Sequence, residues 1–409
     1  MTNIYVIDAP CGAGKTSGAI NMINNDSNNN KYLFITPFLK EVERIKEQCN
    51  DKGFFEPQEI GTKLNGIHWL INNEKNIVST HALFLNFNEK TMDLLRQKQY
   101  ILILDEVVDV VKIIEISKKD LESILDRYAH IEDGLMIWDD EDYTGKFNDI
   151  MRMALNKCVG IYKNAALVWC FPIEVFKLFK EVYILTYMFD AQIQKYYYDF
   201  YRLDYDYKYV TTDYYFTDDP QNYFDLCKDY QRLVNVLQNE KMNLIGDSEN
   251  ALSVSWFERD GKSDGAKQAL SNMLKSNLEN YFKNIRKSSS DSNMWTTFKE
   301  YKKILQGGGY TRGFVSVNAR ATNDYGHKTN LAYCANIFMN PILKQFFQQR
   351  EDVKVNEGMY GLSELVQWTW RSAIRNNKLI HIYIPSSRMR GLFKNWLEEV
   401  SNGKITFQK

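Results

Sequence analysis

Two short stretches of the sequence carry residue types at spacings that suit phosphate chemistry. The first, IDAPCGAGKTSG at positions 7–18, sets Gly12 and Gly14 before Lys15 and Thr16. The glycines allow backbone angles at which successive N–H groups turn toward an anion, the lysine reaches the β- and γ-phosphates, and the threonine hydroxyl holds Mg²⁺. We therefore predict a loop that binds a nucleotide and Mg²⁺. It comprises Ala9, Pro10, Cys11, Gly12, Ala13, Gly14, Lys15, Thr16 and Ser17.

The second stretch, LILDEVVD at positions 102–109, ends an apolar run with acidic residues. Asp105 is placed to bind Mg²⁺ through water, and Glu106 to orient and deprotonate the water that attacks the γ-phosphate. Each stretch has a simpler alternative. For the first stretch the alternative is a glycine-rich turn with an accidental lysine, and Ala9 stands where the G-x-x-x-x-G-K-[ST] pattern has its first glycine. For the second stretch the alternative is a pair of solvated acids at a strand end. Together they favour a nucleoside triphosphatase.

These residues require strands and helices that bring them to one edge of a sheet. Residues 1–115 alternate apolar runs with helical segments, as a parallel α/β sheet requires. The predicted strands are 4–7, 32–38, 76–84 and 100–111, and the predicted helices are 16–24 and 39–49. The order predicts that both motif stretches follow strands of the same sheet.

The rest of the chain is predicted to hold an insertion and a second α/β region. Residues 117–180 are expected to be mostly helical, with Ser117 as an N-cap, and 181–192 to return to strand. The tyrosine-rich run 196–215 breaks the pattern, so we place the crossing between two domains there. A polar segment at about 260–294 is expected to be a mobile insertion, and 378–385 reads as a strand before a closing helix.

Composition limits the class of protein. The chain of 409 residues has room for two or three domains, and its net charge of −1 means that a nucleic-acid partner would need a local basic surface. Six scattered cysteines without a C-x-x-C pair favour reduced thiols over a zinc ribbon. A loop that starts at residue 9 leaves no room for a signal peptide, and no apolar run approaches the roughly 18 residues of a membrane span. We expect a soluble cytoplasmic protein.

The order of segments resembles the superfamily 2 helicases, and among them the compact helicase-like proteins of bacteriophages. The resemblance covers nearly the whole chain, and the order of the motifs is its strongest part. APCGAGKT (9–16), FITPFLKEVERI (34–45), VSTHALF (78–84) and DEVVD (105–109) resemble motifs I, Ia, Ib and II. LTYMFDAQ (185–192), WTTFKEY (295–301), ARATNDYGHKTNLAY (319–333) and QWTWRSAIR (367–375) resemble motifs III, IV, V and VI.

The resemblance implies an α/β fold of two RecA-like lobes, parallel sheets flanked by helices with helical insertions. The lobes would span 1–195, with an insertion at about 117–180, and 196–409. It implies ATP as the nucleotide, with Lys15, Glu106, Gln367, Arg371 and Arg375 in catalysis and Thr16 and Asp105 at Mg²⁺. The residues implied in nucleic-acid contacts are Thr36, Pro37, Thr80, His81, Thr297, Thr322 and Asn323.

The activity implied is ATP hydrolysis, stimulated by nucleic acid, that drives movement along DNA or its unwinding in phage-type replication or recombination. The partner is then single-stranded or duplex DNA, with RNA as the alternative polymer, and a loader or replication protein; no membrane partner is expected. Two other functions stay open: an ATP-switched loading protein without processive unwinding, and a packaging motor of the terminase type. The latter needs a nuclease domain with clustered carboxylates.

The chain departs from the family pattern at three places. Val108 stands at the fourth position of the D-E-x-[DH] box, with the acid one residue later. Trp370 stands where motif VI has glycine, and Arg371 and Arg375 are four residues apart instead of three; on a helix either spacing leaves both on one face. No segment before residue 9 can supply a motif that reads adenine. Trp256, Trp295, Trp368 and Trp370 could stack on bases, although burial in a core is the commoner use.

Overall fold

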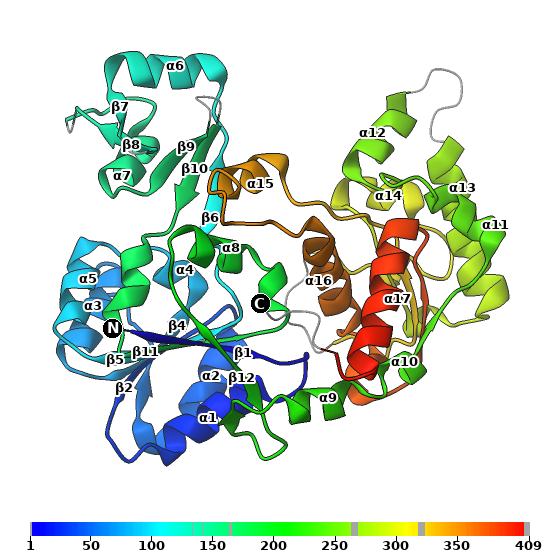
Figure 1. Cartoon of the computed structure of the whole chain (residues 1–409), viewed down its shortest axis with the longest axis horizontal. Helices are drawn as coiled ribbons and strands as arrows, with labels where there is room; N and C mark the ends of the chain where they lie inside the picture. Colours follow the sequence, from blue (N-terminus) through cyan, green and yellow to red (C-terminus); the bar gives the residue numbers. More distant parts are fainter. Residues whose placement is uncertain are drawn as a thin grey trace. The chain divides into compact units, whose positions relative to one another are not determined.

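The computed structural model describes residues 2–132, 134–140, 142–162, 166–262, 269–317 and 324–404. The chain divides into two units (Figure 1). The first comprises Met1–Ala9, Gly14–Asp219 and Asn340–Val355, and the second comprises Pro10–Ala13, Pro220–Met339 and Asn356–Lys409. Within the described part of the chain, no helix is both long and apolar enough to span a bilayer. The six cysteines form no disulfide.

The first unit is built on a sheet whose described strands follow the order β13-β12-β1-β11-β5-β2-β4-β3. All neighbours pair in parallel except β12 and β13. The strands are β1 (Asn3–Asp8), β2 (Lys31–Thr36), β3 (Phe54–Phe55), β4 (Asn76–Thr80), β5 (Tyr100–Asp105), β11 (Glu181–Thr186), β12 (Asp206–Val210) and β13 (Phe216–Thr217). Every residue of β5 is buried, as expected for a central strand covered on both faces.

Helices cover this sheet and connect its strands (Figure 1). They are α1 (Lys15–Asn25), α2 (Leu39–Gln48), α3 (Lys63–Asn72), α4 (His81–Phe84), α5 (Glu89–Arg96) and α8 (Ile193–Phe200). The predicted helices and parallel strands in the first 115 residues are therefore present, but two strands are much shorter than predicted: β4 ends at Thr80, just before α4 begins, and β5 ends at Asp105. Because β12 pairs with β1, this unit continues to Asp219, beyond the expected crossing near residue 195.

The insertion was expected to be helical, and that expectation is wrong. Between β5 and β11 the described residues form an antiparallel sheet in the order β6-β10-β9-β8-β7, called here the inserted sheet. It consists of β6 (Val111–Ile114), β7 (Ala129–Glu132), β8 (Leu135–Trp138), β9 (Val159–Tyr162) and β10 (Ala166–Cys170). Short apolar runs such as these do not distinguish a strand from a piece of buried helix by periodicity.

Two helices pack on the inserted sheet and give it a core of its own. They are α6 (Lys118–Arg127) and α7 (Asn148–Leu155). Ser117 is the N-cap of α6, as predicted, and its hydroxyl accepts from the amide of Asp120 at 3.1 Å. Leu121, Ile124, Met136 and Leu167 are buried together in this core. The insertion is thus an independently packed layer joined to the first unit.

The second unit is built on a parallel sheet in the order β14-β17-β16-β15 among its described strands. These are β14 (Val234–Val236), β15 (Asn293–Thr296), β16 (Asn330–Tyr333) and β17 (Ile380–Tyr383). The helices are α9 (Gln221–Cys227), α10 (Tyr230–Leu233), α11 (Glu240–Asn243), α12 (Val254–Lys262), α13 (Ala269–Asn280), α14 (Lys302–Leu305), α16 (Glu357–Thr369) and α17 (Ser387–Ser401). The predicted fold class, two α/β lobes with parallel sheets flanked by helices, is confirmed. Residues 263–268 of the polar segment 260–294 lie outside the described residues.

One helix from the C-terminal half of the sequence packs on the first unit. Helix α15 (Pro341–Phe347) sets Phe346 against Phe200, with ring centroids 4.9 Å apart, and Gln345 accepts a hydrogen bond from the Tyr162 hydroxyl at 2.5 Å. The helix therefore contacts both α8 and the inserted sheet. Sequence periodicity contains no sign of such a long-range return.

Candidate active site

The predicted phosphate loop connects β1 directly to α1. Gly12 and Gly14 have φ values of 88° and 87°, in the left-handed region that favours glycine. At Gly14 a Cβ atom would lie 2.4 Å from the ring of Tyr214, so a side chain there would be strained by the backbone angle and would also displace that exposed ring. Gly14 is the N-cap of α1, and no side chain caps the first N–H groups of that helix. These groups and the helix dipole suit an anion.

Four side chains lie beside this loop, two from the start of α1 and two from the ends of β2 and β5. Lys15 donates from Nζ to the carbonyl of Ala9 at 2.6 Å. The Thr16 hydroxyl donates to Asp105 Oδ1 at 3.1 Å, and the Thr36 hydroxyl donates to Asp105 Oδ2 at 3.2 Å. The carboxyl ends of parallel strands share one edge of a sheet, and this brings together residues that are far apart in the sequence. The predicted Mg²⁺ residues Thr16 and Asp105 are thus in contact.

The Asp105 carboxyl is buried, and this shifts its pKa. The side chain lies under the sheet edge, and burial, followed by the nearby charges of Glu106 and Glu41, raises the pKa of Asp105 to about 7. The hydrogen bonds from Thr16 and Thr36 oppose that rise. Carboxylate and hydroxyl oxygens are the ligands that Mg²⁺ prefers, and a divalent cation would supply the positive charge that a buried carboxylate requires. The residues fit a magnesium site.

Glu106 directly follows β5 and has an uncommon backbone conformation. Its φ is 74°, a left-handed conformation that is uncommon for a residue with a side chain, and its amide donates to the carbonyl of Leu185 at 2.9 Å. The side chain is half-buried. Next to it, His81 at the start of α4 places Nε2 3.0 Å from the carbonyl oxygen of Asp105. His81, which was predicted to contact nucleic acid, therefore contacts the backbone of Asp105.

Sequence reasoning missed Asp8, the last residue of β1. Its two carboxylate oxygens accept the amides of Met188 and Phe189, each at 3.0 Å, and so hold the loop that follows β11. Burial raises the pKa of Asp8 to about 6, while these bonds and the charge of Lys15 lower it. The available signal was an acid that ends an apolar strand directly before the phosphate loop.

Gln194 in α8 was also missed, and it bears on the departure at Val108. The Gln194 side chain accepts from the amide of Val108 at 2.9 Å and donates to the Tyr198 hydroxyl at 2.9 Å. The backbone of the fourth position in the D-E-x-[DH] box is thus tied to the helix after β11, where the family uses a side chain at that position. Nothing in the local sequence indicates this contact.

Other predicted residues are placed as follows in the first unit. Ser17 accepts at its hydroxyl from Arg44 Nη2 at 3.1 Å. Thr36 is buried against Asp105, so its present partner is the acid and not solvent. Pro37 follows β2 and is half-buried, and Thr80 is the N-cap of α4, with its hydroxyl 3.4 Å from the amide of Leu83.

The predicted residues of motif VI lie in the second unit, with a geometry that differs from the expectation. Gln367 is in α16, which ends at Thr369. Arg371 follows in a turn, and Arg375 belongs to a separate 3₁₀ helix, Ala373–Asn376. The two arginines therefore do not share one helix face, and that expectation is wrong. Between the two helices the backbone is extended at Ser372, whose hydroxyl donates to the carbonyl of Thr369 at 2.7 Å.

The tryptophans considered for base stacking are buried. Trp370 packs edge-on against Tyr230 and Trp396, with centroids 4.7 and 5.2 Å away, which explains a large side chain where the family has glycine. Trp256, Trp295 and Trp368 are also buried in the second unit. Thr297 follows β15 and is fully buried. Thr322 and Asn323 lie outside the described residues.

The sheet order, the loop and the paired acids define an α/β protein of the P-loop nucleotide-binding class. Residues 2–120 match the family "Type III restriction enzyme, res subunit", and this confirms the predicted resemblance to superfamily 2 helicases. Residues 111–169 match the "YonV middle domain", which coincides with the inserted sheet, and residues 228–397 match the "YonV C-terminal Rossmann-like domain".

A similar protein is the SPbeta prophage-derived protein YonV of Bacillus subtilis (strain 168). The two are 41% identical over 415 residues, which cover 97% of this chain and 99% of the relative. The chain belongs to the YonV family. Among solved structures, Xpd4 of S. tokodaii is 12% identical, with 99% of this chain and 95% of that chain covered and a TM-score of 0.45. The helicase MrfA bound to DNA and AMPPNP is 10% identical, with 97% and 48% covered and a TM-score of 0.35.

Proposed function

We propose that the protein hydrolyses ATP in response to nucleic acid and uses the cycle to move along DNA or to unwind it. The observation that carries this proposal is the meeting of Thr16, Thr36 and Asp105 at one sheet edge beside Lys15. Such an arrangement of lysine, hydroxyl and buried acid matches what phosphoryl transfer needs from a protein, which is positioning and charge neutralisation.

Each residue of the site has a defined part in the proposed reaction. Lys15 would exchange the Ala9 carbonyl for the β- and γ-phosphates, and Thr16 and Asp105 would hold Mg²⁺, which would neutralise phosphate charge. Glu106 accepts the proton of the attacking water. Arg371 and Arg375 are proposed to stabilise the charge on the γ-phosphate, and Gln367 to position the water. The nucleic-acid contacts are proposed for Pro37, Thr80, His81, Thr322 and Asn323. They are not proposed for Thr36 and Thr297, whose burial leaves them no exposed surface.

The contact between Val108 and Gln194 supports a coupling between the site and α8 despite the departure at Val108. A hydrogen bond of 2.9 Å joins the segment that follows β5 to α8. Asp8 bonds the loop that leads to that helix. These hydrogen bonds can therefore transmit a movement at the phosphates to α8, although the side chain of Val108 at the fourth position of the box takes no part. The prophage origin of the relative supports DNA as the polymer and a bacterial cell as the setting.

A strand-displacement assay run beside an ATPase assay separates the proposal from its alternatives. The proposed enzyme displaces a labelled strand from a partial duplex with ATP and not with a non-hydrolysable analogue. Hydrolysis without displacement on tailed duplexes of either polarity would favour the ATP-switched loading protein. Metal-dependent cleavage of plasmid DNA would favour the packaging motor, although the described residues contain no metal-binding cluster of three or more His, Cys, Asp or Glu.

A further inference from the structure

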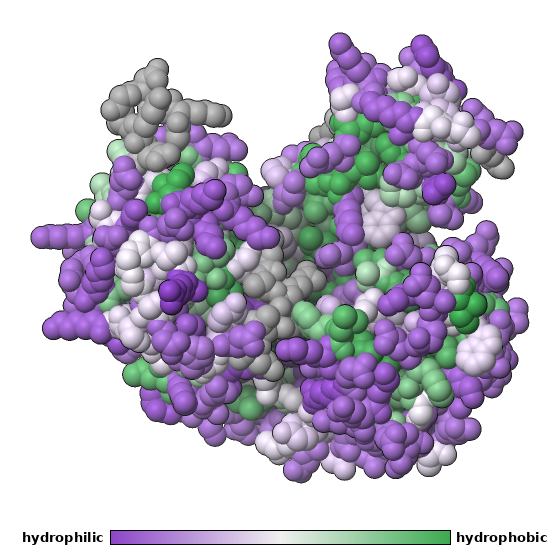
Figure 2. Space-filling view, turned by 180° about the vertical axis from the view of Figure 1, so that it is seen from behind, coloured by the Kyte–Doolittle hydropathy of each residue, from purple (hydrophilic) through white to green (hydrophobic). Residues whose placement is uncertain are grey.

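The first unit contains a second hollow, separate in its lining from the phosphate loop. A cavity of about 1020 Å³ lies between the lobe and the inserted sheet. One wall is the segment from Ala82 at the start of α4 to Arg96 at the end of α5. The other wall comes from β6, β10 and the end of α7. The surface is hollowed beneath the inserted sheet, which forms the upper right part of Figure 2.

An aromatic ring and a cation face this cavity from neighbouring strands. Trp169 of β10 is only partly buried, and it pairs directly across the strands with Lys112 of β6. The Lys112 ammonium lies 5.7 Å from the centroid of the Trp169 ring, within the range of a cation–π contact. A partly exposed indole that borders a cavity offers a flat apolar face to a ligand.

Some of the charged side chains that line the cavity have ion-pair partners and others do not. Lys112 and Lys157 are exposed and line the cavity, and neither forms an ion pair with any residue that the structure describes. Arg96 and Glu174 also line it, but each has a partner within its own segment, Asp93 at 2.5 Å and Lys177 at 2.7 Å. Glu89 is the remaining acid of the lining. The lysines therefore favour an anionic occupant.

We propose that this cavity binds a segment of single-stranded nucleic acid, with a base stacked on Trp169 and phosphates at Lys112 and Lys157. This inference rests on the proposed function and adds a second contact to it. Stacking on an aromatic face beside cations is how proteins hold single strands without reading sequence, and it requires a base that is not already stacked in a duplex. The cavity exceeds most small-molecule pockets, which span roughly 300–1,000 Å³, and it begins next to His81.

The experiment measures the affinity of the full-length protein for a fluorescent oligo-dT by anisotropy over a range of salt concentrations. Trp169→Ala is expected to weaken binding about tenfold, and Trp169→Phe to keep most of it, because one stacked base is lost only in the former. Replacing Lys112 and Lys157 with alanine should make the slope of log affinity against log salt shallower by roughly 1.4, since each phosphate contact on a single strand contributes about 0.7.

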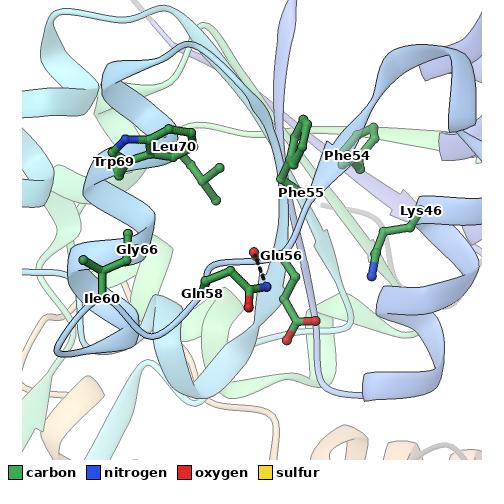
Figure 3. Close-up of a pocket in the computed structure, with 9 residues that line it drawn as sticks. All are labelled: Lys46, Phe54, Phe55, Glu56, Gln58, Ile60, Gly66, Trp69 and Leu70. Carbon is green, nitrogen blue, oxygen red and sulfur yellow. Dashed lines mark hydrogen bonds between the residues drawn. The ribbon is translucent and has the colours of Figure 1, made fainter.

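The matched control is Trp69→Ala. Trp69 in α3 is a more exposed tryptophan, and it lines a different cavity of about 350 Å³ with Phe55, Ile60 and Leu70 (Figure 3). The Trp69→Ala variant should bind oligo-dT as the wild type does. Thermal unfolding of each variant shows whether the fold is retained, and a photo-crosslink from 5-iododeoxyuridine in oligo-dT to Trp169 of the wild type tests the contact without any mutation.

The outcomes separate this inference from the function on which it rests. Wild-type protein that binds no single-stranded DNA or RNA overturns the proposed function and the inference together. Wild-type binding with unchanged affinity and salt slope in the Trp169 and lysine variants, or crosslinks that map elsewhere, overturns only the inference. An equal loss in Trp69→Ala would also contradict it, because the effect would then not belong to this cavity.

Discussion

Replacing Asp105 with asparagine is expected to stabilise the nucleotide-free protein at neutral and alkaline pH. The raised pKa of about 7, against an ordinary value of 3.8, means that the folded protein retains a proton that the unfolded chain releases. The stability that this proton contributes is complete below about pH 4 and is lost as the pH rises through about 7. The difference corresponds to about 4 kcal/mol at about 1.4 kcal/mol per pH unit.

Asparagine has no charge to bury, so the variant does not incur this loss. It can still accept from one of the Thr16 and Thr36 hydroxyls, and its amide can donate to the other, so we expect a net gain of roughly 2–4 kcal/mol at pH 8. For a unit of this size that is an increase in Tm of about 5–10 °C. Thermal unfolding in EDTA at pH 5, 6, 7 and 8 measures it, and the advantage should shrink toward pH 5.

The controls use an exposed acid and the metal. Glu115→Gln changes an exposed carboxylate that follows β6, and this variant should unfold as the wild type does at every pH. Addition of Mg²⁺ with an ATP analogue should raise the Tm of the wild type at pH 8 and leave that of Asp105→Asn unchanged. A variant that is less stable than the wild type at pH 8 would refute the reasoning, because Asp105 would then be a stabilising anion.

Five other substitutions test the proposed chemistry. Lys15→Ala should remove hydrolysis and weaken ATP binding, because no other cation in the loop can replace its phosphate contact; near-normal turnover would contradict this. Glu106→Gln should bind ATP and single-stranded DNA without hydrolysis, and loss of both kinds of binding would make the residue structural. Arg371→Lys and Arg375→Lys should each lower kcat at least roughly tenfold at saturating DNA with ATP affinity within a few fold, since lysine lacks the planar fork; unchanged kcat in both would remove the second unit from catalysis. Gln194→Ala should lower the unfolding free energy by about 1–3 kcal/mol through the unpaired amide of Val108, and should reduce DNA-stimulated turnover more than basal turnover; equal loss of both would make the contact structural only.

Local patterns were sufficient for the elements that carry the nucleotide site. The strand before Ala9, the helix after Gly14 and the buried strand that ends at Asp105 follow from apolar runs and from glycines at fixed offsets. Parallel pairing then brings the strand ends together without further information from the sequence. Those features are encoded within a few residues of each functional side chain.

The features that sequence reasoning missed depend on contacts between distant residues. The pairing of Lys112 with Trp169 adds β6 to the edge of the inserted sheet, and apolar runs of four or five residues do not indicate that pairing. Asp8 and Gln194 act on backbone amides that come from elsewhere in the chain. Trp370 was noted as a departure from a motif, but its burial against Tyr230 becomes visible only in the packed unit.

The central claim is that the site at the ends of β1 and β5 hydrolyses ATP under the control of nucleic acid. Steady-state release of phosphate, measured with no polymer, single-stranded DNA, duplex DNA and RNA in turn, tests it most directly. The account predicts Mg²⁺-dependent hydrolysis that rises severalfold with single-stranded DNA and is absent in Lys15→Ala. Hydrolysis that is indifferent to every polymer, or that persists in Lys15→Ala, would contradict it.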